Sequence, residues 1–143
     1  MGRGRHALPL ARAGFRTFGV DVTLEAVRDA IAAARAEGLR VEGWCADLTR
    51  YPLPRAAFDL IVVCRYLQRD LFADLRAALA PGGTVIYETF TTAQRALGKP
   101  PASADHLLEP GELRRQFDGL DLLFYEEVLA PDAVARLAAQ SRS

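Results

Sequence analysis

Residues 2–7 read Gly-Arg-Gly-Arg-His-Ala, and about twenty residues later an apolar stretch closes on Asp21. This order, in which a glycine-rich turn is followed by a helix, a strand and then an acid, is typical of a loop that binds a nucleotide cofactor. Glycines let the backbone approach a ligand closely, and the first amides of the helix carry partial positive charge. The carboxylate of Asp21 can accept hydrogen bonds from ribose hydroxyls, although it could equally cap the helix that follows. The stretch therefore predicts an adenosine-containing cofactor.

Helical and strand-like segments alternate along the rest of the chain, which is typical of an α/β fold with a parallel sheet. The run Phe58 to Cys64 is almost continuously apolar, which predicts a strand covered by helices on both faces. We expect one domain over residues 1–143, because this length suits a single core. Helices are expected over residues 4–13, 23–37, 69–79 and 110–117, and strands over 15–20, 39–45, 58–64, 84–88, 120–128 and 134–139.

Three connections stand out between these elements. Residues 81–83 read Pro-Gly-Gly and predict a tight turn. Residues 91–108 read as a long irregular loop, and loops of this length inside a compact domain are often functional lids. The last two strands are expected to pair antiparallel through the Ala-Pro-Asp turn at residues 130–132.

Composition excludes several classes of partner. The 18 basic residues equal the 18 acidic residues in number, so no net field attracts nucleic acid or an anionic membrane. No apolar run is long enough to cross a bilayer, and the arginine-rich start lacks the core of a signal peptide, so a cytoplasmic location is expected. Cys45 and Cys64 have neither metal-ligand nor redox spacing, and no bound metal is expected.

A second acid, Asp47, follows the strand predicted over residues 39–45. An acid in this place can accept the exocyclic amine of adenine while the neighbouring Leu48 lines the ring. An acid followed by leucine also occurs in ordinary turns, so Asp47 alone does not indicate a cofactor site. The prediction depends on the order of the glycine turn, Asp21 and Asp47 along the chain. The glycine turn, Asp21 and Asp47 each lie at the carboxyl end of a successive strand, the edge at which open α/β sheets bind ligands.

Five stretches in this order carry a family resemblance: residues 2–6 (Gly-Arg-Gly-Arg-His), 18–21 (Phe-Gly-Val-Asp), 45–48 (Cys-Ala-Asp-Leu), 58–63 (Phe-Asp-Leu-Ile-Val-Val) and 79–84 (Leu-Ala-Pro-Gly-Gly-Thr). The chain resembles class I S-adenosylmethionine-dependent methyltransferases over nearly its whole length, and most of all the small bacterial members of the tellurite-resistance-like branch. The resemblance implies a Rossmann-like, doubly wound, mostly parallel sheet with a C-terminal antiparallel hairpin. It also implies methyl transfer from S-adenosylmethionine to a small-molecule acceptor.

The resemblance also implies roles for individual residues. On the cofactor side, Gly2 and Gly4 would border the methionine moiety, Asp21 would hold the ribose, and Asp47 with Leu48 would meet the adenine. Just past the fourth family strand, Cys64 would face the sulfonium. The candidates on the acceptor side are Arg65, Tyr66 and Glu88, the last because it ends the strand predicted over residues 84–88.

The chain departs from the family pattern at its front. Family members carry a strand before the position of Gly2, and here Met1 takes that place, so the sheet is expected to lack its first strand and the true start to lie upstream. Two alternatives stay open. A nicotinamide-dependent oxidoreductase shares the nucleotide loop, and an inactive, truncated relative could bind a partner without catalysis. The acceptor and the oligomeric state are not readable from the sequence.

Overall fold

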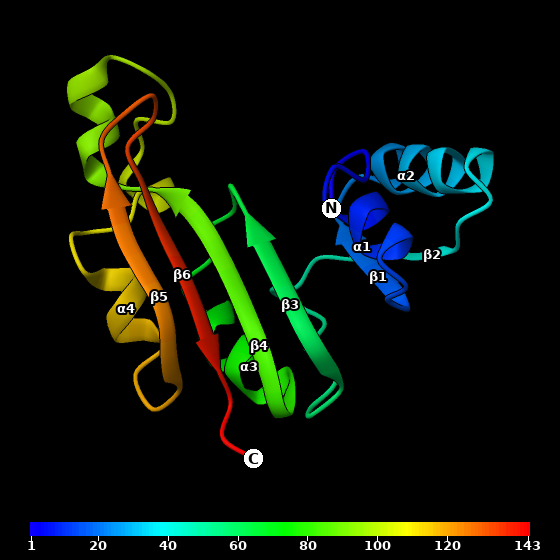
Figure 1. Cartoon of the computed structure of the whole chain (residues 1–143). Coiled ribbons are helices and arrows are strands. Elements are labelled where there is room, and N and C mark those ends of the chain that lie inside the picture. The colour runs from blue at the N-terminus through cyan, green and yellow to red at the C-terminus, as the bar shows by residue number, and fades with distance from the viewer. The chain divides into compact units, whose positions relative to one another are not determined.

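Residues 1–51 and residues 52–143 form separate units in the computed structural model, which describes every residue of the chain (Figure 1). The first unit holds a two-stranded sheet and the second a four-stranded sheet. The expectation of one domain over residues 1–143 stays a prediction.

The first unit is built around two parallel strands. Helix α1 (Ala7–Arg12) precedes strand β1 (Thr17–Asp21), and helix α2 (Leu24–Ala36) precedes strand β2 (Val41–Cys45). In the register of the two strands Asp21 lies opposite Cys45, so both strands end at the same edge. Small side chains allow close packing here, since the buried hydrophobic residues are Ala7, Val27, Ala30, Ala34 and Val41.

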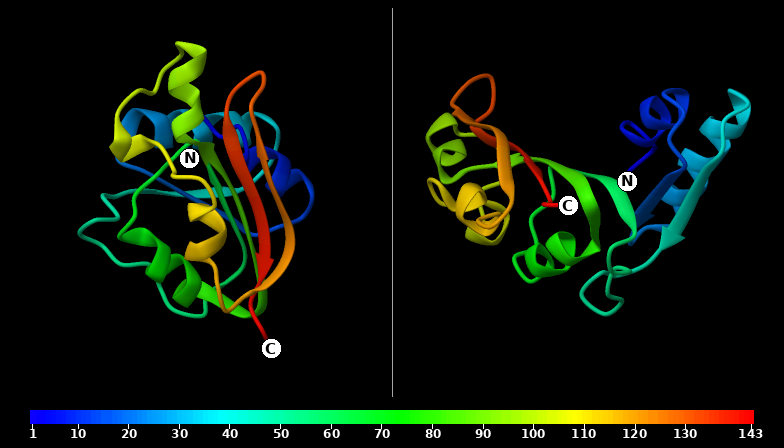
Figure 2. Two further views of the ribbon diagram at one scale, coloured as in Figure 1. Left: turned by 90° about the vertical axis from the view of Figure 1, so that its left-hand side faces the viewer. Right: turned by 60° about the horizontal axis from the view of Figure 1, so that its bottom comes forward.

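The second unit is a four-stranded sheet in the order β3-β4-β6-β5. Strand β3 is parallel to β4, whereas β6 is antiparallel to both of its neighbours. Helices α3 and α4 lie on one face of this sheet (Figure 2). The elements are β3 (Phe58–Cys64), α3 (Leu71–Ala78), β4 (Leu79–Phe90), α4 (Glu112–Gln116), β5 (Asp121–Val128) and β6 (Val134–Gln140).

Three aromatic rings make the centre of the second unit's core. Phe72 of α3 lies 5.6 Å from Tyr87 of β4 and 5.6 Å from Phe117, which follows α4, measured between ring centroids. All three side chains are almost fully buried. The hydroxyl of Tyr87 donates to the carbonyl oxygen of Tyr66 at 2.7 Å, so the polar end of a core ring fixes the backbone just past β3. Burial raises the pKa of this hydroxyl, which stays protonated.

The segment between β4 and α4 is irregular, as expected, and its two ends are held together by a backbone bridge. It contains two short 3₁₀ helices, η1 (Thr92–Leu97) and η2 (Ala104–His106). Thr91 bridges to Leu108, and the side chains of Leu107 and Leu108 are fully buried. The loop is therefore anchored to the core at its end.

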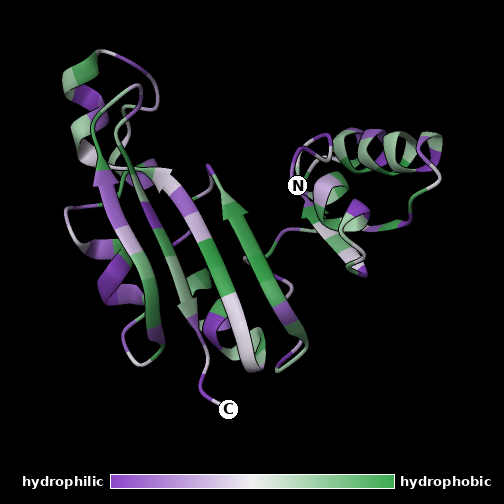
Figure 3. Cartoon of the chain, in the orientation of Figure 1, coloured by the Kyte–Doolittle hydropathy of each residue, from purple (hydrophilic) through white to green (hydrophobic).

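Three sequence expectations about the fold were wrong. The strands do not form one mostly parallel sheet, because the structure has two sheets and two of the three ladders in the larger one are antiparallel. Strand β3 is hydrophobic along most of its length (Figure 3) but no residue of it is fully buried. The Pro-Gly-Gly turn at residues 81–83 lies within β4 as an irregularity of its pairing with β3. The antiparallel hairpin of β5 and β6 is confirmed.

None of the helices is both long enough and apolar enough to cross a membrane.

Arg69, just before α3, forms an ion pair with the first residue of α4 and also contacts the end of the long loop. Arg69 donates to both carboxylate oxygens of Glu112, at 2.7 and 3.0 Å, and to the carbonyl oxygen of Leu107 at 2.9 Å. The backbone N–H of Glu109 also donates to Glu112. Burial raises the pKa of Glu112, but the bonds from Arg69 and Glu109 lower it more, so the net pKa lies below its usual value.

This ion pair predicts acid-sensitive stability. Because the pKa of Glu112 is lower in the folded than in the unfolded chain, its stabilising effect is complete above about pH 4.5 and is lost as pH falls through the folded value. We expect Glu112→Gln to cost about 1–2 kcal/mol near neutral pH, because one charge of the pair is removed. Urea denaturation followed by circular dichroism should show this difference shrinking below pH 4.5. A difference that stays constant on acidification would contradict the assignment.

Candidate cofactor and acceptor sites

The glycine turn has the backbone that its sequence requires. Gly2 and Gly4 have φ angles of +50° and +89°, in the left-handed region that favours glycine. A Cβ on Gly4 would lie 2.3 Å from Cδ1 of Leu8 and 3.3 Å from Cβ of Ala30, so this turn packs closely against α2. Around Gly2, by contrast, no atom lies within 4 Å of the position a Cβ would take. The turn thus has one glycine set by packing and one that borders open space.

Asp21 orders the same turn. Its Oδ2 accepts hydrogen bonds from the backbone N–H of Gly2 at 2.9 Å and from the amino group of Met1 at 3.2 Å. Its Oδ1 accepts from the N–H of Thr23 at 2.9 Å, at the start of α2. Burial raises the pKa of Asp21, but these bonds lower it more, so it lies below its ordinary value. The alternative interpretation of Asp21 as the N-cap of α2 is wrong, because Thr23 is the N-cap and no side chain caps the helix; the bond from Asp21 to Thr23 orders the turn before it.

Asp47, unlike Asp21, has hydrogen-bond partners within the protein at only one of its two carboxylate oxygens. Its Oδ1 accepts both the N–H and the hydroxyl of Thr49, at 2.9 and 2.6 Å. These two bonds lower the pKa of Asp47. The second oxygen, Oδ2, has no hydrogen-bond partner within the protein, and the side chain is exposed. Leu48 beside it is half-buried.

The two acids lie at one edge of the first unit. Strand pairing places Asp21 opposite Cys45, and the N–H of Ala46 donates to the carbonyl oxygen of Asp21 at 3.0 Å. Asp47 follows directly, so both carboxylates and the glycine turn are found where β1 and β2 end. A shallow hollow lined by residues such as Arg16 and Arg40 lies at the opposite edge, where these strands begin.

The remaining candidates lie in the second unit, at and just past the end of β3 and, for Glu88, in β4. Arg65 has a φ angle of +55°, unusual for a residue with a side chain, and its N–H donates to the carbonyl oxygen of Glu88 at 2.8 Å. Its Nε donates to Oε1 of Glu88 at 3.0 Å, and Sγ of Cys64 lies 3.9 Å from the same oxygen. The structure therefore brings Cys64, Arg65 and Glu88 together. Tyr66 is exposed and its hydroxyl donates to Gln68.

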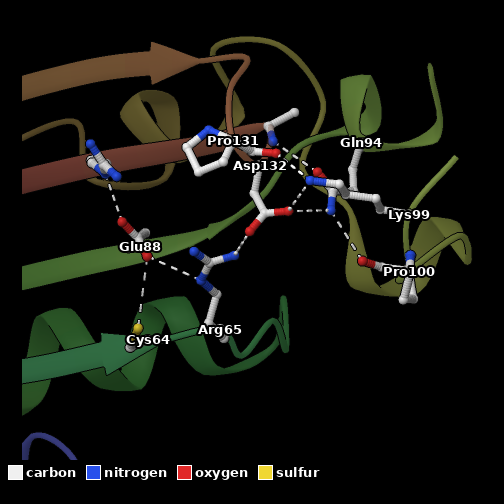
Figure 4. A network of polar contacts seen from close by, with 10 residues as sticks. Cys64, Arg65, Glu88, Gln94, Lys99, Pro100, Pro131 and Asp132 are labelled. Carbon is white, nitrogen blue, oxygen red and sulfur yellow. Dashed lines mark hydrogen bonds and ion pairs between the residues drawn. The ribbon is translucent and has the colours of Figure 1, made fainter. Parts of the chain in front are cut away.

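Three members of this group were not predicted from the sequence. Gln94, Asp132 and Arg136 extend the contacts of Arg65 and Glu88 into one polar network (Figure 4). Only Arg136 had a signal in the sequence, because an antiparallel hairpin with the right register places it beside Glu88. The other two come from loops that local spacing does not connect.

Burial raises the pKa of Glu88, but Arg136 and Arg65 lower it more, and the net value is below the ordinary one. Oε2 of Glu88 accepts from Nε of Arg136 at 2.6 Å. Glu88 is thus ionised at neutral pH with both oxygens engaged, which suits it to hold arginines in place and makes it a poor base. No group of three or more histidine, cysteine or acidic side chains is arranged to hold a metal ion.

Comparison with known proteins gives a family match. A family model described as a methyltransferase domain matches residues 1–83, more than half of the chain. No curated protein matches the sequence significantly.

Many solved structures share the fold. TehB from Haemophilus influenzae aligns with a TM-score of 0.83 and 15% identity, over 99% of this chain and 55% of that one. An S-adenosylmethionine-dependent methyltransferase from Mesorhizobium loti aligns with a TM-score of 0.78 and 20% identity, over 97% and 87%. The N-methyltransferase NodS from Bradyrhizobium japonicum, solved with S-adenosyl-L-homocysteine, gives 0.73 and 17%, over 99% and 74%. The chain thus spans about half the length of TehB, and at these identities the likeness shows a shared fold.

Proposed function

The chain belongs to the methyltransferase domain family, and from this premise we propose that it binds S-adenosylmethionine and transfers the methyl group to a small-molecule acceptor. The observation that carries the proposal is the meeting of the glycine turn, Asp21 and Asp47 at one edge of the first unit. NodS, which has a similar fold, was solved with S-adenosyl-L-homocysteine, and this similarity supports S-adenosylmethionine as the cofactor. Nothing in the comparisons supports a nicotinamide-dependent oxidoreductase.

The donor and acceptor chemistry of the first unit fits an adenosine group. The free Oδ2 of Asp47 can accept the exocyclic amine of adenine, and the half-buried Leu48 can contact the ring. The open space around Gly2 leaves room for a ligand beside the turn. We assign Gly2, Gly4, Asp47 and Leu48 to the cofactor on these grounds.

Asp21 fits the ribose with less capacity than the family role implies. A carboxylate oxygen can accept about two hydrogen bonds. Oδ2 already accepts from Met1 and Gly2, whereas Oδ1 accepts only from Thr23. One hydroxyl can therefore bind at Oδ1, and a second hydroxyl would have to replace a bond at Oδ2. We propose that Asp21 both orders the turn and accepts one ribose hydroxyl.

The proposed methyl transfer requires little acid–base catalysis by the protein. When bound, the cofactor supplies both an electrophilic methyl group and its own leaving group. The protein's part is to position donor and acceptor, and a base is needed only for an acceptor that arrives protonated. On the acceptor side we propose Arg65 and Tyr66, with Cys64 facing the sulfonium. Glu88 contributes by holding Arg65.

A thermal-denaturation experiment tests the proposed function. S-adenosyl-L-homocysteine, the demethylated cofactor, stabilises a unit that binds it by about 2.7 kcal/mol at a hundred times its Kd. The single tryptophan, Trp44, lies in the first unit, so its fluorescence reports the unfolding of the unit that carries the proposed site. We expect the melting temperature to rise with S-adenosyl-L-homocysteine and to stay unchanged with NADH. A rise with NADH alone would favour the oxidoreductase, and no rise with either would favour a chain that binds no cofactor.

A further inference from the structure

The acceptor-side network has an imbalance between its hydrogen-bond acceptors and donors. Both oxygens of Glu88 are used, Oε1 by Arg65 and Oε2 by Arg136. Both oxygens of Asp132 are also used: Oδ1 accepts from Nε2 of Gln94 at 3.1 Å, and Oδ2 lies 3.5 Å from Nη1 of Arg65. Each carboxylate oxygen of Glu88 and Asp132 therefore already contacts a donor of the protein itself.

Some N–H donors of Arg65, in contrast, have no acceptor within the protein. A guanidinium group carries five N–H bonds. Arg65 uses Nε toward Glu88 and Nη1 toward Asp132, and its Nη2 has no partner in the protein. The Arg65 side chain is 33% exposed, so these remaining N–H groups can reach a ligand. What the network offers to a bound molecule at Arg65 is thus hydrogen-bond donors on a permanent positive charge.

The guanidinium of Arg65 is also held in one orientation. Its Cζ atom lies 4.4 Å from the centroid of the Phe90 ring, an arrangement that stabilises a cation over an aromatic face. Glu88 contacts the guanidinium at Nε and Asp132 contacts it at Nη1, and the left-handed backbone of Arg65 is fixed by its bond to Glu88. Figure 4 shows Arg65 between Glu88 and Asp132. A fork that is already ordered loses little entropy when it binds a ligand.

We propose that Arg65 recognises an oxyanion of the methyl acceptor, so that the substrate is an acidic small molecule carrying a carboxylate or a similar group. This inference rests on the proposed function, because it assigns the substrate class of the same reaction. Two parallel N–H donors of a guanidinium match the two oxygens of a carboxylate. A cationic acceptor would have to share the oxygens of Glu88 and Asp132 with donors of the protein that already contact them, whereas an anion meets open N–H groups at Arg65.

Charge balance shapes how this recognition works. The network pairs the cations Arg65, Lys99 and Arg136 with the carboxylates Glu88, Asp132 and Glu126. Opposite charges this close cancel at a distance, so the site does not attract anions from far away. Selection must therefore come from direct hydrogen bonds at Arg65. Tyr66 beside it supplies exposed aromatic surface for the apolar part of the acceptor.

Nuclear magnetic resonance of the arginine Nε–H groups tests the proposal on the full chain. The probes are benzoate, its neutral analogue benzamide, the cation benzylamine and inorganic phosphate. Arg142 is the matched control, because it is 72% exposed and also makes one ion pair, with Asp121. The signals are assigned by Arg65→Lys and Arg142→Lys, and the Arg65→Lys variant keeps the charge but loses the planar fork.

We expect benzoate to shift the Arg65 signal at millimolar concentration, with benzamide and benzylamine leaving it unchanged and Arg142 responding at least several-fold more weakly. A shift with phosphate as well would assign oxyanions in general, and a shift with benzoate alone would assign carboxylates. Equal responses of Arg65 and Arg142, or a response to benzylamine in place of benzoate, would overturn the proposal. Calorimetric titration of S-adenosyl-L-homocysteine on the same sample tests the proposed function separately, so each can fail without the other.

Discussion

Replacing Asp21 with alanine is expected to weaken the binding of S-adenosyl-L-homocysteine about a hundredfold, or roughly 2.7 kcal/mol. Two losses add up. The carboxylate would no longer accept a ribose hydroxyl, and a hydrogen bond to a charged group contributes about 1.5–3 kcal/mol. The variant also frees the N–H groups of Gly2 and Thr23, so the turn has to be ordered when the ligand binds. Isothermal calorimetry measures the change.

Two further variants separate binding from folding. Asp29→Ala removes another carboxylate of the first unit, one that is 46% exposed and pairs only with the exposed Arg3, and it should leave the affinity unchanged. Asp21→Asn keeps an oxygen for Thr23 but loses the charge, and we expect an affinity between those of wild type and Asp21→Ala. The fluorescence of Trp44 shows whether each variant is folded. An Asp21→Ala variant that is folded and binds like wild type would remove Asp21 from the cofactor site.

The second large effect concerns Gln94, which is fully buried in the second unit. Its Oε1 accepts from the N–H of Ala133 at 2.8 Å, while Nε2 donates to the carbonyl oxygen of Pro100 and to Asp132, both at 3.1 Å. Leucine has a similar volume and makes none of these bonds. Because each buried group left without a partner costs about 1–3 kcal/mol, we expect Gln94→Leu to destabilise the fold by about 2–4 kcal/mol.

Urea denaturation followed by circular dichroism measures this cost. Gln140→Leu is the matched control, since Gln140 is half-buried and its side chain donates a single bond, to the carbonyl oxygen of Gly82. We expect the control to lose no more than about 1 kcal/mol. Equal losses in the two variants would mean that the connection from Gln94 to the loop and to Asp132 adds nothing beyond an ordinary hydrogen bond.

The sequence predicted the elements well where local chemistry decides them. The run Phe58 to Cys64 forms a strand with those bounds, because a β-branched apolar stretch between polar turns has few alternatives. Gly14 and Gly38 end their helices with positive φ angles, as their positions predicted. The hairpin after residue 120 also follows from alternation and a turn. Local pattern alone was enough in each case.

Pairing between distant segments was harder to predict. Whether strands lie in one sheet or two depends on contacts that no local pattern records, and the exposure of β3 follows from the same contacts. The ion pairs around Arg65 join residues from β4, β6 and two loops, including Asp132 and Arg136. Ionisable side chains have no periodicity that reveals a partner, so the polar network around Arg65 could be identified only from the three-dimensional structure. Asp21 and Asp47, in contrast, were found because each lies at or just past the end of a strand, β1 for Asp21 and β2 for Asp47.

The most direct test of the account is an amide nuclear magnetic resonance titration of the chain with S-adenosyl-L-homocysteine. The account predicts that the largest shifts fall on Gly4, Asp21, Asp47 and Leu48, at the edge where β1 and β2 end. Shifts gathered instead around Arg16 and Arg40, at the edge where these strands begin, would contradict it, as would a titration that moves no signal of the first unit.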